Sequence, residues 1–527
     1  MPRRLPHWIR LSMLVLALAG SVQGADDLRD PHRQHGAPAL LGSLSCAASA
    51  CHGRVGNRRE PTTQPGGEFV RWSLDDPHSR AAQLLTSPRF AQILARYVDP
   101  DSNDDNERRR RTGLCAACHD PMGIATTVFG ESATVGISAE PLTDGSVSNG
   151  PITAHRGIGC ESCHGPSRDW IGHHAEPGIS RSTLAALGMT PTKSLAERAV
   201  VCSSCHVGSA TQDMNHDMIA AGHPELIFEL ASFMRRLPKH WNDRQERSRV
   251  TEFESRVWLA GQWSSLQAAL RTCEGRADRA SSSSDAQPWP ESAEYDCLAC
   301  HQPLQAAAAT VPIHHRKTTI LQPVLQRSRW PYAFADLVLD PSDTDSRGRL
   351  DRLLAPVASG FASPQATATE LRALLAQVPV RPDAITCTDS PTRVILEAVR
   401  SHANNASTWD EFCQLVLALS AVERAYYDEL QLVFPGGNDE ATNRTREVQA
   451  DRRQLELIRN GLAFAPNGRI PRWMLTGQGP TDHDRDSDRT AFPSPRLPDM
   501  LNELARNWQL RWDSLPGRAA PGNGATK

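Results

Sequence analysis

The hydrophobic pattern of this chain is that of short helices separated by polar and turn-rich stretches. Leu84, Phe90 and Leu94 belong to a set of apolar residues that recur at helical spacing within residues 72–97. Asp76-Pro77 opens this segment, and proline is favoured at a helix start. Further helical stretches are expected over residues 194–200, 225–237 and 251–271. The pattern predicts a mainly α protein with few strands.

The pattern changes after about residue 345, where longer helical periods follow one another. They cover residues 368–378, 391–403, 408–434 and 444–464. Ser390 before Pro391 is a cap followed by a first-turn proline, and Thr408 with Glu411 makes a capping box. The sequence therefore predicts a helical C-terminal bundle over residues 346–515 and a disordered tail over residues 516–527.

Residues 25–345, which precede the bundle, are expected to form a region of sparse helices and loops. Residues 1–24 resemble a secretory signal peptide: Arg3, Arg4 and Arg10 come first, residues 11–19 are apolar, and Val22-Gln23-Gly24 resembles a cleavage site. An uncleaved anchor is the alternative. Signal cleavage predicts a periplasmic or secreted protein with no integral membrane segment.

Composition adds one unusual feature. The chain has 527 residues and a formal net charge of -3, so nothing indicates a nucleic-acid partner. Its 13 cysteines and 19 histidines are the counts that need an explanation.

The cysteines and histidines meet in a repeated motif. Four regular C-x-x-C-H copies comprise Cys115, Cys118 and His119; Cys160, Cys163 and His164; Cys202, Cys205 and His206; and Cys297, Cys300 and His301. A wider copy, C-x4-C-H, comprises Cys46, Cys51 and His52. In a c-type haem site the two thiols bind the porphyrin covalently, and the histidine is an axial iron ligand. The alternatives are zinc-binding cysteine pairs and, for Cys46 and Cys51, a disulfide loop. Repetition with the histidine retained, after a secretory signal, favours five haem c groups.

Other histidines are candidates for the second axial position of each iron. His78 opens a predicted helix, and His155 lies just before the motif at residues 160–164. His173 and His174 follow Trp170, and an aromatic residue soon followed by a histidine suits packing on a porphyrin with one nitrogen reaching an iron. One of the two is expected to be a ligand, and His174 is the candidate. His216 and His223 could share one helix face, with one of them a ligand, and His315 lies within reach of the fifth motif.

Three segments resemble the cytochrome c-552/4 family of multihaem cytochromes c. They are His155-Arg156-Gly157-Ile158-Gly159-Cys160-Glu161-Ser162-Cys163-His164-Gly165-Pro166, Asp76-Pro77-His78, and Asn215-His216-Asp217 with Ala220-Ala221-Gly222-His223-Pro224. The resemblance covers residues 40–335 well and the C-terminal part loosely. It implies covalent haems, mostly with two histidines on each iron, a periplasmic location and electron transfer. It also implies that His155, His78, His216 and one of His173 and His174 are distal ligands. The chain departs from the family at its wider first motif and at Gln302, which follows the last motif histidine.

Closely spaced haems predict an electron relay between redox partner proteins, with no catalytic residue. One alternative is a pentahaem reductase of nitrite or a similar small oxyanion at one open haem. Such reductases typically replace one motif histidine by lysine, whereas all five are histidine here. A third reading is a haem-bearing scaffold whose C-terminal bundle docks partners. The sequence also leaves open whether Cys387 and Cys413 form a disulfide, because their positions on the predicted helices suggest a large separation.

Overall fold

The computed structural model describes residues 40–55, 65–98, 105–123, 157–282, 287–295, 327–339, 344–354, 363–377, 390–406, 409–461 and 497–516. Helices are the regular elements of these segments. No strand occurs within them, and an isolated bridge joins Tyr295 to Arg327. The prediction of a mainly α fold is confirmed.

The first half of the described chain contains short helices joined by loops. These are η1 (Ser43–Cys46), α2 (Glu68–Asp75), η2 (Pro77–Thr86), α3 (Pro88–Tyr97), α4 (Asp105–His119), α6 (Cys160–His164), α7 (Arg181–Ala186), α8 (Leu195–His206), α9 (His216–Ala220), α10 (Leu230–Arg236) and α11 (Asp243–Arg249).

Longer helices dominate the second half. They are α12 (Phe253–Ser281), α14 (Ala335–Val338), α15 (Thr344–Leu354), α16 (Pro364–Gln377), α18 (Pro391–His402), α19 (Trp409–Val433), α20 (Asp439–Glu447), α21 (Gln449–Gly461) and α24 (Leu497–Asp513), with the short η4 (Ser292–Glu294) after α12. Three of these α-helices, α14, α15 and α24, are not among the helices that the sequence predicts, and neither is η4.

The single helix predicted over residues 72–97 is wrong in detail, because the structure divides it into α2, η2 and α3. Both breaks precede a proline, at Asp76-Pro77 and at Ser87-Pro88. Proline lacks an amide hydrogen and disfavours helical geometry in the residue before it. Asp76 and Ser87 each turn this break into a new helix start by accepting a hydrogen bond from a first-turn amide.

Two other predicted helices also change. The helix expected over residues 225–237 is reduced to α10, and the one over residues 444–464 is divided into α20 and α21 around Val448. At the start of α18 the predicted cap is confirmed: Ser390 accepts a hydrogen bond from the Arg393 amide, with Pro391 in the first turn. Thr408 and Cys387 lie outside the described residues, so the capping box and the disulfide stay predictions. Cys413 is a buried free thiol.

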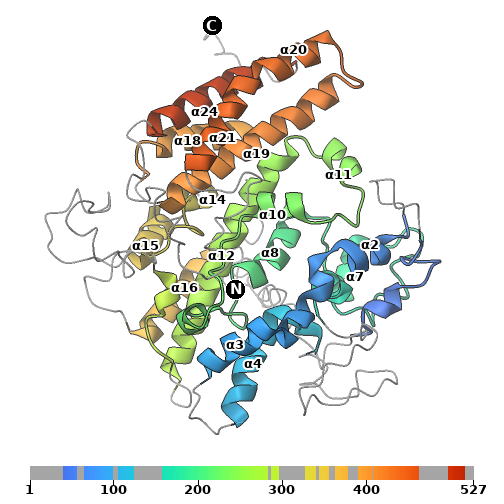
Figure 1. The fold of residues 1–527 in the computed structure, drawn as a ribbon, viewed down its shortest axis with the longest axis vertical. Coiled ribbons are helices and arrows are strands. Elements are labelled where there is room, and N and C mark those ends of the chain that lie inside the picture. Colours follow the sequence, from blue (N-terminus) through green and yellow to red (C-terminus); the bar gives the residue numbers. More distant parts are fainter. Residues whose placement is uncertain are drawn as a thin grey trace, which may run out of the picture.

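The long helix α12 runs through the middle of the molecule, with the C-terminal helices gathered at one end and α2 to α4 at another side (Figure 1). It packs against α8 and α10 from the first half and against α16, α18 and α19 from the second. Its side chains are buried on all faces, and Trp258 and Trp263 are almost completely enclosed. A helix that is buried all round is a core helix rather than an amphipathic surface helix.

One hydrophobic core extends across the boundary predicted at residues 345 and 346. It runs from Ala199 of α8 through α12 to Trp508 and Leu515 near the end of the described chain. The domain division itself stays a prediction, but the helices on its two sides share buried side chains. Among the described residues, no helix is both long enough and apolar enough to cross a membrane.

Candidate functional site

Four of the five motifs lie in the described residues, and three of them occupy the last turn of a helix. His119, His164 and His206 are the final residues of α4, α6 and α8. A helical turn places residues three and four apart on the same face, so both thiols and the imidazole can face one side. The wider motif follows η1, which ends at Cys46. The fifth motif lies outside the described residues, as do His155 and His315.

Each of the four described motif histidines faces a second histidine from elsewhere in the chain. The ring centroids of His52 and His174 are 6.1 Å apart, as are those of His206 and His78. The separations between His119 and His223 and between His164 and His240 are both 6.2 Å.

This spacing fits two imidazoles on opposite sides of one metal ion. A metal–nitrogen distance of about 2.0 Å, with each ring centre about 1.1 Å beyond its nitrogen, separates the two centres by about 6 Å. Direct aromatic contacts have centroid distances of about 4.5–7 Å, so what sets these pairs apart is that each contains a motif histidine. The four pairs therefore have the span that an axially ligated iron requires.

Hydrogen bonds hold the other ring nitrogen of most of these histidines. At two of these histidines the Nδ1 atom contacts a carboxylate. Glu68 Oε2 lies 3.0 Å from His52 Nδ1, and Asp76 Oδ1 lies 2.9 Å from His78 Nδ1. Backbone carbonyls of Ile171 and Pro224 lie 2.7 and 2.8 Å from the Nδ1 atoms of His174 and His223. Metal-ligating histidines typically donate their second N–H in this way, which leaves Nε2 to bind the metal.

His240 is the ring partner that the sequence interpretation does not identify. It follows the end of α10, where Pro238 stops the helix, and its ring packs against Trp241 at 5.2 Å. Among the described residues, its Nδ1 atom is buried without a hydrogen-bond partner. A histidine beside an aromatic residue after a helix stop was the available signal, and it resembles the signal that favours His174 after Trp170.

The remaining predicted candidates have other surroundings. His173 is exposed and pairs with Glu176, 2.7 Å away, so the structure places His174 rather than His173 opposite a motif histidine. His216 begins α9, and its amide donates to Glu291 Oε1 at 2.9 Å. Glu291 caps η4, the last helix before the fifth motif. His216 thus lies next to the segment that leads into Cys297.

Burial keeps most of the paired imidazoles uncharged. It lowers the pKa of His164 and of His206 to about 4, and it also lowers the pKa of His119, His223 and His240. A neutral imidazole is the form that binds metal ions. His78 differs, because its hydrogen bond to Asp76 raises its pKa.

Thiols from different motifs lie against one another and define which motifs are neighbours. The Cys46 thiol hydrogen-bonds with Cys160, which lowers the pKa of Cys46 to about 6. The Cys205 thiol hydrogen-bonds in the same way with Cys118. Burial raises the pKa of Cys163 to about 12, and the nearby Cys202 and Cys205 thiols add to this rise. When the motifs are numbered along the chain, the first therefore lies next to the third, the third next to the fourth, and the fourth next to the second.

A buried carboxylate ties the first and third motifs together. Glu161, between the two cysteines of the third motif, accepts the amides of Leu41 and Gly42 at 3.0 and 2.7 Å. Ser43 accepts the Cys160 amide at 3.1 Å, and a Cβ at Gly159 would lie 2.2 Å from Ser43 Oγ. Gly159 therefore allows this close approach of the two segments. Glu161 has no sequence signal beyond its place inside the motif.

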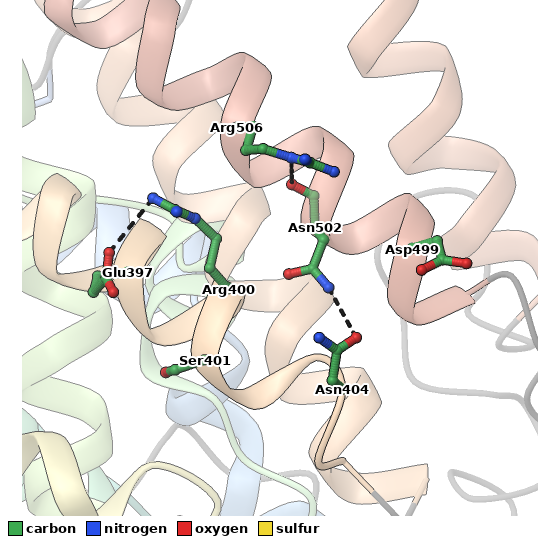
Figure 2. A pocket seen from close by; sticks show the side chains of 7 residues that line it. All are labelled: Glu397, Arg400, Ser401, Asn404, Asp499, Asn502 and Arg506. Carbon is green, nitrogen blue, oxygen red and sulfur yellow. Dashed lines mark hydrogen bonds and ion pairs between the residues drawn. The ribbon is translucent and has the colours of Figure 1, made fainter.

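A separate open pocket lies between α18 and α24 in the C-terminal helices. Arg400 pairs with Glu397 at 3.5 Å, and the Asn502 amide donates to Asn404 at 3.0 Å (Figure 2). The pocket contains no motif cysteine or histidine. Within the described residues, no group of three or more histidine, cysteine or acidic side chains is placed to hold a metal ion without another ligand.

No family model, curated protein or solved structure matches this chain. The resemblance to the cytochrome c-552/4 family stays a prediction from the sequence motifs, and the functional argument rests on the residues and distances given above.

Proposed function

We propose that this protein is a periplasmic multihaem c-type cytochrome that relays electrons through five covalently bound haems. The observation that carries the proposal is the set of four histidine pairs, each joining a motif histidine to a distant histidine at 6.1–6.2 Å. A C-x-x-C-H motif alone accounts for the presence of one histidine in each pair. Ligation of a shared iron accounts for both histidines and for the distance between them.

The protein supplies attachment, orientation and electrostatics to these groups. Each cysteine pair would form the thioether bonds, and each paired histidine would hold one axial position. Haem iron, when bound, supplies a one-electron carrier. The contacts between thiols of successive motifs support short separations along the order first, third, fourth, second.

The fifth motif also needs a distal histidine. Four distal positions are assigned to His78, His174, His223 and His240 by the ring pairs. His216 then serves His301, because Glu291 holds the start of α9 next to the segment that enters the fifth motif. The second motif lies near His216, since Met214 and Met218 pack beside Leu114 and Tyr97.

The histidine pairs argue against the alternative function, reduction of nitrite or a similar oxyanion. At four motifs the paired histidines would hold both axial positions of a bound iron, so a substrate could bind only if His216 left the fifth iron open. Electron relay between redox partner proteins is therefore the function that we propose for the whole set. The C-terminal helices extend the core that holds α8 and α12.

The test is a haem count on the mature protein, produced with a cytochrome c maturation system. Intact mass and a pyridine haemochrome assay are expected to give five haems per chain, with a low-spin spectrum. Replacing Cys115 and Cys118 by serine should remove one haem. Cys273→Ser is the matched control: this buried cysteine of α12 lies outside every motif, so the count should stay at five. A protein that matures without covalent haem would contradict the proposal.

A further inference from the structure

We infer that Glu68 and Asp76 lower the reduction potentials of the first and fourth haems below that of the third. This inference rests on the proposed function and assigns two carboxylates a tuning role within it. It starts from the acceptor that each paired histidine finds for its Nδ1 atom.

At the first motif, Glu68 is held in position by a second contact. Its Oε2 atom lies 3.0 Å from His52 Nδ1, and its Oε1 atom accepts the Gly66 amide at 3.1 Å. The pair is partly open to solvent, with 41% of the His52 side chain and 29% of the Glu68 side chain exposed. Solvent screens such a contact, so its effect should be moderate.

At the fourth motif, the carboxylate is more enclosed. Asp76 Oδ1 lies 2.9 Å from both the Nδ1 atom and the backbone amide of His78, and only 4% of the Asp76 side chain is exposed. His78 is the ring partner of His206.

Among the described residues, no carboxylate is hydrogen-bonded to either imidazole of the third motif. His164 Nδ1 lies 3.3 Å from the Thr192 hydroxyl, and His240 Nδ1 has no hydrogen-bond partner among the described residues. Arg198, near both histidines, is paired with Glu246 at 2.6 Å. Asp76 and Glu68 also act on His240 through space, but neither is hydrogen-bonded to it.

The strength of the hydrogen-bond acceptor at each Nδ1 atom predicts the order of the haem reduction potentials. A carboxylate that accepts the Nδ1 hydrogen makes the imidazole a stronger donor to the metal. A stronger donor favours ferric over ferrous iron, because the ferric state carries one more positive charge. A neutral hydroxyl or an absent acceptor has less effect, since hydrogen bonds to charged groups are about twice as strong.

The order of the motifs places the haem of higher potential between the two haems of lower potential. The third motif adjoins the first through the hydrogen bond between Cys160 and Cys46, and it lies near the fourth, whose Cys202 and Cys205 thiols act on Cys163 through space. A haem of higher potential between two of lower potential is the site where an electron resides longest. The relay would then have a holding site at His164 and His240.

The test is a potentiometric titration of the holoprotein followed by visible and electron paramagnetic resonance spectra. Asp76→Asn should raise the potential of one low-spin haem by the equivalent of at least a tenfold change in its reduction constant, about 59 mV for one electron. Asparagine still caps a helix, so η2 should survive the change. Glu68→Gln should raise a different haem by less, because its contact is more exposed, and the double variant should show both shifts.

Two control variants match these changes. Glu176→Gln removes a carboxylate from His173, which faces no motif histidine. Asp75→Asn removes the carboxylate next to Asp76 in the sequence. The Asp75 side chain pairs with Arg71 and is half exposed. Both controls should leave all potentials within a small fraction of the shift seen in Asp76→Asn. Asp76 also lies near His240, so a smaller rise at the third haem is expected to accompany the main one.

The outcomes separate this inference from the proposed function. Five low-spin haems with potentials unchanged in Asp76→Asn and Glu68→Gln would overturn the tuning role and leave the relay intact. Shifts of the same size in the two controls would also overturn it. Absence of covalent haem from the unmodified protein would overturn the proposed function itself.

Discussion

A histidine offers a metal the ring nitrogen that the protein does not already hold. Hydrogen-bond acceptors lie at the Nδ1 atoms of His52, His78, His174 and His223, so Nε2 is the free nitrogen at each of these residues. His240 is held differently, by burial and by its contact with Trp241. Its ring also faces the motif histidine His164, which makes His240 an informative single histidine to replace.

Replacing His240 by alanine should open one axial position and leave the haem count unchanged. The Cys160 and Cys163 thiols still attach the haem and His164 still binds its other side. We expect about one haem in five to become high spin and to bind cyanide or carbon monoxide, measured by absorption and electron paramagnetic resonance spectra. His173→Ala is the control, because this exposed residue faces no motif histidine, and its spectrum should match the unmodified protein. An entirely low-spin His240→Ala protein would remove His240 from the site.

Local motifs can be read from the sequence, but partners that come from distant segments cannot. Each motif specifies its own thiols and imidazole within five residues, or seven in the wider first copy, so all five are evident from the sequence. The ring opposite each imidazole depends on how α4, α8, α10 and the loops pack. His240 shows the consequence, since nothing near it in sequence is a motif, and it reaches His164 only through the fold.

At the scale of helices, apolar spacing indicates where a helix exists, and local chemistry decides where it ends. The pattern over residues 72–97 is helical throughout, yet Pro77 and Pro88 divide it, because each removes an amide donor. In α12 the reverse holds: the helix continues past the expected end at residue 271 to Ser281, since core contacts on all faces replace an amphipathic pattern. The C-terminal helix α24 has its buried residues at regular helical spacing, so this helix was open to prediction.

Two helical glycines provide a matched test of how tightly α12 packs. A Cβ at Gly275 would lie 2.8 Å from the Ala210 Cα atom, whereas nothing lies within 4 Å of a Cβ at Gly113 in α4. Alanine is favoured over glycine in a helix by about 1 kcal/mol, so Gly113→Ala should stabilise the fold. Gly275→Ala should instead lower the free energy of unfolding, because overpacking costs about 1–3 kcal/mol. Urea unfolding followed by circular dichroism measures both, and equal effects would contradict the close contact.

At the scale of the molecule, buried polar contacts join α12 to the C-terminal helices. Ser255 hydrogen-bonds with Thr392 at 2.7 Å, and Gln262 donates to Gln414 at 3.1 Å. Glu252, the N-cap of α12, adopts a left-handed conformation with φ 56° and accepts the Thr392 amide at 2.8 Å. These contacts lie between segments that the sequence assigns to separate domains. A boundary drawn from motif content alone does not detect a shared core, because it takes no account of which helices cover one another.

The central charge of this junction is Glu254, whose carboxylate joins α11, α12 and α19. Its oxygens lie 2.6 Å from Arg247 Nη2 and 3.0 Å from Arg424 Nε, and the residue is buried. Glu254→Gln would leave two arginines near one another without their shared counter-charge. Removing one partner of a buried ion pair typically costs about 3–5 kcal/mol, so we expect a loss of this order in the free energy of unfolding at neutral pH.

The loss should shrink as the pH falls, for a reason that the surroundings of Glu254 supply. Burial alone would raise its pKa, but Arg424 and Arg247 outweigh burial and lower the pKa below the ordinary glutamate value. A carboxylate with a lowered folded-state pKa stabilises the fold above its unfolded pKa, and the contribution is lost as the pH falls through the folded value. The stability of the unmodified protein should therefore approach that of Glu254→Gln in acid. Glu274→Gln is the control, because Glu274 pairs with the exposed Arg372 at 2.8 Å and such surface pairs contribute about 1 kcal/mol or less. A Glu254→Gln protein as stable as this control at neutral pH would show that the junction does not depend on the buried charge.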